Sequence, residues 1–322
     1  MVGLALCLPR RGQPQGLPYR WCQPPEIPKN HQVFFLTDIH FRHSKNLVSP
    51  ALLSVYLALP TPFSYPIMPF IALSSSRVYY TYNRRPAEGP ALVLVHGAGG
   101  THFSWPTTLR LAPFAAAYTL DLPGHGRSPA PGRSTIDAYA DVVSEFVTTL
   151  NLPQVVVGGI SMGGAVAQTL GLRQPDWLTG LLLVGTAAAL PVGDAILHHI
   201  LPEFAAAMRL VARLEWPKGT PDTQIELSYQ ELISTTPEVV YADFAACHAF
   251  DVRSRLHQIA VPTLVIAGTV DKLTPLPQME YLARNIPQAT LCPFTGAGHM
   301  VALEHPEPVA AAVAAWFTHT WG

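Results

Sequence analysis

The sequence contains few charged residues, few cysteines and no long apolar run. Only 13% of its 322 residues are charged, and the formal net charge is −1. No basic face is available for nucleic acid, so we expect no nucleic-acid partner. The four cysteines show neither a CxxC pair nor the spacing of metal ligands. We therefore expect no disulfide framework, no metal site and a reducing, cytoplasmic location.

The apolar stretches near the N-terminus are too short to act as membrane segments. Residues 1–8 are shorter than the core of a secretion signal, and no basic residue precedes them. Residues 47–59 are shorter than a membrane span and contain Pro50. We expect neither a secretion signal nor a transmembrane helix.

The first 67 residues differ in composition from the rest of the chain. They are rich in proline, carry a net positive charge and show no sustained period of 2 or 3.6. Two interpretations of residues 1–67 are open: a disordered extension, or a misassigned one with translation starting at Met68. Both interpretations place the function after Met68.

Apolar runs of strand length then alternate with helical patterns or turns. Continuous apolar strands of this kind are typical of a parallel sheet that is buried on both faces. The pattern predicts an α/β fold with a mostly parallel β-sheet flanked by helices. The predicted strands lie at residues 91–95, 116–120, 154–159, 180–185 and 263–268.

The sequence also predicts one well-defined helix and one helical insertion between the strands. Residues 136–150 show helical spacing, and Ser134 with Asp137 predicts a capping box in front of them. Between residues 186 and 260 the strands stop, and helical segments separated by prolines replace them. We expect a helical cap here, without a core of its own, inserted between core segments 68–185 and 261–322.

Ser161 stands between two pairs of small residues in the stretch "VVVGGISMGGAVAQ". A strand before it and a helix after it force a very tight turn, at which a Cβ on Gly159 or Gly163 would collide with the facing element. The helix that begins here directs free N–H groups toward the turn. The hydroxyl of Ser161 is therefore the candidate nucleophile, at a G-x-S-x-G elbow.

A serine hydroxyl needs a base, and the base needs an acid that orients it. Asp271 follows the predicted strand at 263–268, and His299 follows a strand-like stretch, "ATLCPF". Both residues are therefore expected at the same edge of the sheet as Ser161. The order Ser, acid, His along the chain is the one expected of a hydrolase with this elbow.

A developing oxyanion needs backbone donors close to the nucleophile. The turn "HGAGG" follows the strand at 91–95, and an N–H group of Ala98 or Gly99 can pair with the N–H group of Met162. We predict an oxyanion hole made by Ala98 and Met162.

Taken together, these motifs resemble the α/β-hydrolase fold superfamily over residues 68–322. The resemblance rests on "HGAGG", "DLPGHGRS", "GISMGG", "GTVDKLTP" and "GAGHMVALEHPEPV". It implies a Ser161–Asp271–His299 triad, a helical cap and no cofactor. His125 and Arg127 match a structural loop of the family rather than a catalytic one. The turn is not of the HGGG type, which argues against the lipase branch.

The predicted activity is carboxylic ester hydrolysis through an acyl-enzyme on Ser161. Hydrolysis of carbon–carbon bonds or enol-lactones with the same triad is an alternative, and a non-catalytic small-molecule receptor of the same fold is another. The expected partner is a small apolar ester or acyl substrate. About half of six cap residues are expected to line its pocket: Phe204, Met208, Leu210, Val211, Leu214 and Trp216.

Overall fold

The computed structural model describes residues 20–21, 70–83 and 89–322. The predicted extension at residues 1–67 lies outside the described residues, except for the two-residue strand β1 (Arg20–Trp21). The interpretation of that extension therefore stays a prediction.

The described strands form one sheet in the order β1-β9-β8-β7-β6-β4-β5-β3-β2. Every neighbouring pair from β1 to β5 in this order is parallel, whereas β3 and β2 are antiparallel. The prediction of a mostly parallel sheet is confirmed. The strands are β2 (Phe70–Ala72), β3 (Arg77–Tyr82), β4 (Ala91–Val95), β5 (Ala117–Asp121), β6 (Val155–Ile160), β7 (Leu178–Val184), β8 (Thr263–Gly268) and β9 (Ala289–Phe294).

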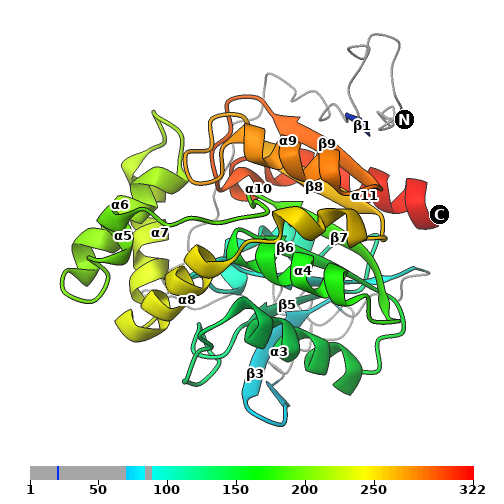
Figure 1. The fold of residues 1–322 in the computed structure, drawn as a ribbon, viewed down its shortest axis with the longest axis horizontal. Coiled ribbons are helices and arrows are strands. Elements are labelled where there is room, and N and C mark those ends of the chain that lie inside the picture. Colours follow the sequence, from blue (N-terminus) through cyan, green and yellow to red (C-terminus); the bar gives the residue numbers. More distant parts are fainter. Residues whose placement is uncertain (1–19, 22–69, 84–88) are drawn as a thin grey trace, which may run out of the picture.

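The apolar strands are buried because helices cover both faces of the sheet (Figure 1). Successive side chains of a strand point to opposite faces. In β4, Val93 and Val95 join the core on one face, whereas Leu92 and Leu94 join the core on the other. The first face is covered by α3 (Ile136–Thr149), α4 (Met162–Arg173) and α9 (Leu276–Asn285), and the second by α2 (Thr107–Arg110), α10 (Val301–Glu304) and α11 (Pro306–Trp321).

Helix α3 begins at Ile136, where the helical spacing predicts it, but its N-cap is one residue later than the predicted Ser134. Thr135 is the N-cap, and its hydroxyl accepts a hydrogen bond from the N–H group of Ala138. The predicted capping box of Ser134 and Asp137 is therefore wrong. A helix that starts after Thr135 has Ile136 as its first residue and buries that side chain in the core.

Four α-helices lie between β7 and β8, beyond the ends of the strands (Figure 1). They share a cluster of buried apolar residues that includes Met208, Val211 and Val240. The expectation that this segment lacks a core of its own is therefore wrong. The helices are α5 (Asp194–Leu197), α6 (Phe204–Glu215), α7 (Asp222–Ile233) and α8 (Pro237–Ala249). No helix in the described part of the chain is long and apolar enough to cross a membrane.

Candidate active site

Ser161 lies at the junction of β6 and α4 in a backbone conformation that is rare outside glycine. Its φ is 52° and its ψ is −116°. A non-glycine residue at positive φ is strained, and such strain persists only where the surroundings fix it. The N–H group of Ser161 donates to the carbonyl of Val184 on the adjacent strand, at 3.1 Å. The strained turn is thus held by the sheet itself.

The glycines around Ser161 make this turn possible. A Cβ added to Gly159 would lie 2.0 Å from the carbonyl oxygen of Gly163, and one added to Gly163 would lie 2.4 Å from the carbonyl oxygen of Val95. Both distances are far below van der Waals contact. Neither position can therefore carry a side chain, as the sequence predicts.

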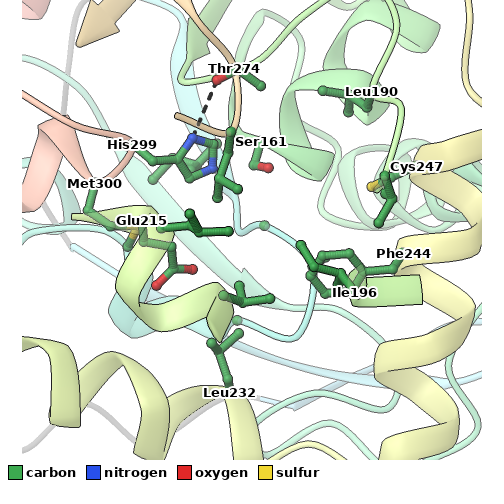
Figure 2. A pocket seen from close by; sticks show the side chains of 18 of the residues that line it. Ser161, Leu190, Ile196, Glu215, Leu232, Phe244, Cys247, Thr274, His299 and Met300 are labelled. Carbon is green, nitrogen blue, oxygen red and sulfur yellow. Dashed lines mark hydrogen bonds between the residues drawn. The ribbon is translucent and has the colours of Figure 1, made fainter. Parts of the chain in front are cut away.

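His299 and Asp271 are in direct contact, as their positions after two neighbouring strands predict. Nδ1 of His299 lies 2.9 Å from Oδ2 of Asp271. The other carboxylate oxygen of Asp271, Oδ1, accepts the N–H groups of Leu273 and Thr274 at 2.8 and 2.9 Å. The Thr274 hydroxyl donates to Oδ2 at 2.7 Å and lies 3.3 Å from Nδ1 of His299 (Figure 2). Asp271 is thus fixed at both oxygens.

The contact between the two residues sets their charge states. Burial raises the pKa of Asp271. The charge of His299 and the hydrogen bond from it outweigh this effect, so the pKa of Asp271 is below its usual value. Burial lowers the pKa of His299, but Asp271 outweighs that effect and raises its pKa above the usual 6.5. Asp271 therefore stays ionised at neutral pH and favours a positive charge on the imidazole.

Ser161 and His299 both line a cavity of about 270 Å³ beneath the cap (Figure 2). The walls are mainly apolar side chains, among them Ile196, Phe244 and Cys247 across the cavity from the serine. This volume lies just below the roughly 300–1,000 Å³ of typical small-molecule sites.

Fewer of the six named cap residues line the cavity than expected. Val211 and Leu214 line it. Met208 is buried within the cap's own cluster, the indole of Trp216 donates to the hydroxyl of Ser228, and Leu210 is 39% exposed. The difference follows from the core that the cap helices share, because that core takes up part of their apolar surface.

Of the predicted oxyanion donors, Met162 directly follows Ser161 in the chain, and Ala98 lines the same cavity as Ser161. Met162 is the first residue of α4, where an N–H group has no partner within the helix. The N–H group of Gly99 donates to Oδ2 of Asp243 at 2.9 Å and is therefore occupied. No hydrogen bond is found for the N–H group of Ala98 within the described residues, and Ala98 lines the cavity. Of the two donors considered in that turn, Ala98 is the one still available.

Glu215, at the end of α6, also belongs to the site, although no motif in the sequence marks it. Its backbone carbonyl accepts the N–H groups of His299 and Met300 at 2.9 and 3.3 Å. Its carboxyl group lines the cavity, and burial raises its pKa to about 7. Glu215 therefore places an ionisable carboxyl group near the histidine.

Thr274 and Glu231 were also missed. A local signal existed for Thr274, because a hydroxyl residue three positions after an aspartate commonly returns a hydrogen bond to it. No comparable signal marks Glu231. Its carboxylate accepts the N–H and hydroxyl groups of Thr101, both at 2.8 Å, and the hydroxyl of Ser104 at 3.0 Å. These partners are 130 and 127 positions away in the chain.

Known proteins are similar to this chain over most of its length. Residues 92–312 match the model of the alpha/beta hydrolase family. A pimeloyl-[acyl-carrier protein] methyl ester esterase of Aromatoleum aromaticum is 30% identical over 250 residues, which is 69% of this chain and 95% of the relative. The 3-oxoadipate enol-lactonase 1 of Acinetobacter baylyi is 28% identical over 232 residues, which is 69% of this chain and 86% of the relative.

A solved structure agrees with the sequence relatives. The structure of a thermophilic esterase superposes with a TM-score of 0.70 at 31% sequence identity and covers 79% of this chain and 98% of its own. The chain belongs to the α/β-hydrolase family. The predictions of this fold superfamily and of a hydrolase as the class of enzyme are thus confirmed.

Proposed function

We propose that the protein is a serine carboxylesterase that hydrolyses small, mainly apolar esters, with residues 186–260 as the cap over its active site. The observation that carries this proposal is that His299, hydrogen-bonded to Asp271, lines the same cavity as the strained Ser161. The similarity to an esterase at 30% identity supports the ester as the bond class.

In the first half of the reaction Ser161 becomes acylated. Nδ1 of His299 donates to Asp271, so Nε2 is the ring nitrogen that accepts the serine proton. Oγ of Ser161 attacks the ester carbonyl, and the N–H groups of Ala98 and Met162 stabilise the resulting oxyanion. The imidazolium then protonates the departing alkoxide, which leaves as the alcohol, and an acyl group remains on Ser161.

In the second half water replaces the alcohol. His299 takes a proton from the water as its oxygen attacks the acyl carbonyl, and the tetrahedral intermediate forms again between the same two donors. The proton returns to Oγ of Ser161 as the acid is released. Asp271 stays ionised throughout, since its role is to orient and stabilise the imidazolium.

The walls of the cavity favour a neutral substrate. Two acidic residues of the cap, Glu215 and Glu231, line it, whereas Lys272 is the one lysine or arginine among the described residues that line it. Lys272 is exposed to solvent. A carboxylate on the acyl part of a substrate would therefore enter a region that already holds acidic groups.

The enol-lactonase alternative rests on the similarity to the 3-oxoadipate enol-lactonase. Adipate is a dicarboxylate, so a lactone derived from it retains a free carboxylate. The acidic groups of the cavity argue against such a substrate. We therefore favour hydrolysis of a neutral ester with the same three residues.

The test is the hydrolysis of p-nitrophenyl esters from acetate to laurate by the purified protein, together with a glutarate monoester that carries a terminal carboxylate. We expect turnover of the short neutral esters and much slower turnover of both laurate and the glutarate monoester. A folded protein that hydrolyses none of the esters would contradict the proposal, and product analysis with a lactone would then test the alternative.

The pH dependence follows from the charge state of His299. Since the reaction needs neutral His299, kcat/KM is expected to fall as the pH falls through the pKa of His299, which lies above 6.5.

Ionised Glu215 also raises the pKa of His299. Replacing Glu215→Gln removes this charge, so the acidic limb of the profile should move to lower pH. Glu226→Gln, an exposed change on α7, is the control and should leave the limb in place. An unmoved limb in E215Q would contradict this electrostatic coupling.

A further inference from the structure

Asp243, on cap helix α8, is fully buried and accepts hydrogen bonds from three different parts of the chain. Oδ2 accepts the N–H group of Gly99 at 2.9 Å and lies 2.7 Å from Nε2 of His125. Oδ1 accepts the hydroxyl of Tyr139 at 2.6 Å. A cap residue is thus bound directly to the turn that carries Ala98.

The surroundings of His125 favour its cationic form beside this carboxylate. Its Nδ1 lies 3.1 Å from the carbonyl of Pro123, so both ring nitrogens face acceptors. An imidazole donates from both nitrogens only when it is protonated. Burial lowers the pKa of His125, but Asp243 outweighs this effect and raises it. Removing one partner of such a buried pair leaves an uncompensated charge, so the pair resists separation.

His96 fixes the other end of the same turn and is neutral. Its Nε2 accepts the N–H group of Leu122 at 3.0 Å, and its Nδ1 bonds to the carbonyl of Gly97 at 2.8 Å. Burial and the adjacent charge of His125 lower the pKa of His96 to about 4. His96, which follows strand β4, therefore fixes the position of the Gly97 carbonyl through this hydrogen bond.

Two further cap residues bind the turn. The hydroxyl of Thr235 donates to the carbonyl of Gly99 at 3.3 Å, and Glu231 binds Thr101 as described above. Gly99 has a φ of +66°, a conformation that these bonds fix from both sides. The backbone before and after Ala98 is thus held by hydrogen bonds, and the cap provides those on the Gly99 side.

We propose that Asp243 is a positioning residue of the active site: it holds Gly99 so that the N–H group of Ala98 points at the oxyanion. The inference rests on the proposed function, since it assigns Ala98 a role in that reaction. It makes the cap part of the machinery that stabilises the tetrahedral intermediate, in addition to its role as a wall of the cavity. Asp243 itself touches neither substrate nor the reacting atoms.

The test compares wild-type protein with Asp243→Asn. An asparagine has one acceptor oxygen in place of two, so it cannot keep all three partners. We expect kcat to fall by about 10- to 100-fold, because small displacements of oriented groups cost rate on this scale. KM should change little. The affinity for a trifluoromethyl ketone, which forms a tetrahedral adduct on serine, should fall together with kcat. The amide of Gly99 should exchange faster with deuterium, as followed by NMR.

Glu226→Gln is the matched control, because it removes a carboxylate of the cap that is exposed and pairs with Arg209. It should leave kcat and the Gly99 exchange rate unchanged. If D243N does not fold, Glu231→Gln is the second variant. We expect it to lower kcat by less than the 10- to 100-fold expected for D243N, because the glutamine amide oxygen can still accept a hydrogen bond from Thr101.

Unchanged exchange at Gly99, or a loss in D243N that lies entirely in KM, would overturn the inference. The exchange measurement does not depend on turnover. A wild-type protein that hydrolyses no ester would therefore count against the proposed function alone.

Discussion

Replacing Ser161→Ala is expected to lower kcat for ester hydrolysis by about 10³- to 10⁶-fold, the range seen where nucleophile, base and acid act as one unit. The change removes the only atom proposed to bond to the acyl group. The rest of the site should survive, because the turn is held by backbone contacts such as the hydrogen bond from the Ser161 N–H group to Val184. KM for short esters should change far less than kcat. The measurement is steady-state hydrolysis of p-nitrophenyl butyrate at neutral pH.

Covalent labelling separates loss of the nucleophile from loss of the fold. A fluorophosphonate probe should label the wild-type protein once and fail to label S161A. Ser254→Ala removes an exposed hydroxyl outside the cavity and should be labelled and active like the wild type. A loss of less than about tenfold in S161A, or labelling that persists in it, would remove Ser161 from the mechanism.

Much of the sheet could be predicted from the sequence because its strands are buried on both faces. Such strands are continuous apolar runs, and the run at 263–268 coincides with β8 (Thr263–Gly268). The run predicted at 180–185 lies at Leu178–Val184 in the structure. The strand starts earlier than predicted because Leu178 already pairs with Val155 of β6, before the apolar run of β7 begins. The register of the two strands then shifts between Val155 and Val156. Such pairing is not visible in one strand alone.

The candidate catalytic residues could also be predicted, because each follows a strand. Parallel strands end at one edge of the sheet, so Ser161, Asp271 and His299 converge whatever the cap does. The carboxylates of the cap follow no such rule. Asp243 and Gly99 are 144 positions apart, and nothing in the sequence of α8 distinguishes a buried aspartate from an exposed one. Their positions depend on how the cap helices pack, which short-range patterns do not encode.

Replacing Asp271→Asn is expected to lower kcat by about 10⁴-fold, the loss measured for the equivalent change in a serine protease. The surroundings of Asp271 determine how an amide would sit there. The N–H groups of Leu273 and Thr274 both point at the position of Oδ1, so the amide oxygen must occupy it. The amide nitrogen then replaces Oδ2 and donates to Nδ1 of His299.

That orientation gives the histidine the wrong tautomer. If Nδ1 accepts a hydrogen bond, the ring proton is on Nε2, and Nε2 can no longer take the proton of Ser161. The fold should tolerate the change, because the amide keeps the two backbone donors satisfied. Asp251→Asn is the matched control, since Asp251 is exposed and pairs with Arg253 at the surface. We expect D271N to unfold near the wild-type temperature while losing almost all turnover. A D271N protein with kcat within tenfold of the wild type would show that Asp271 does not orient the base.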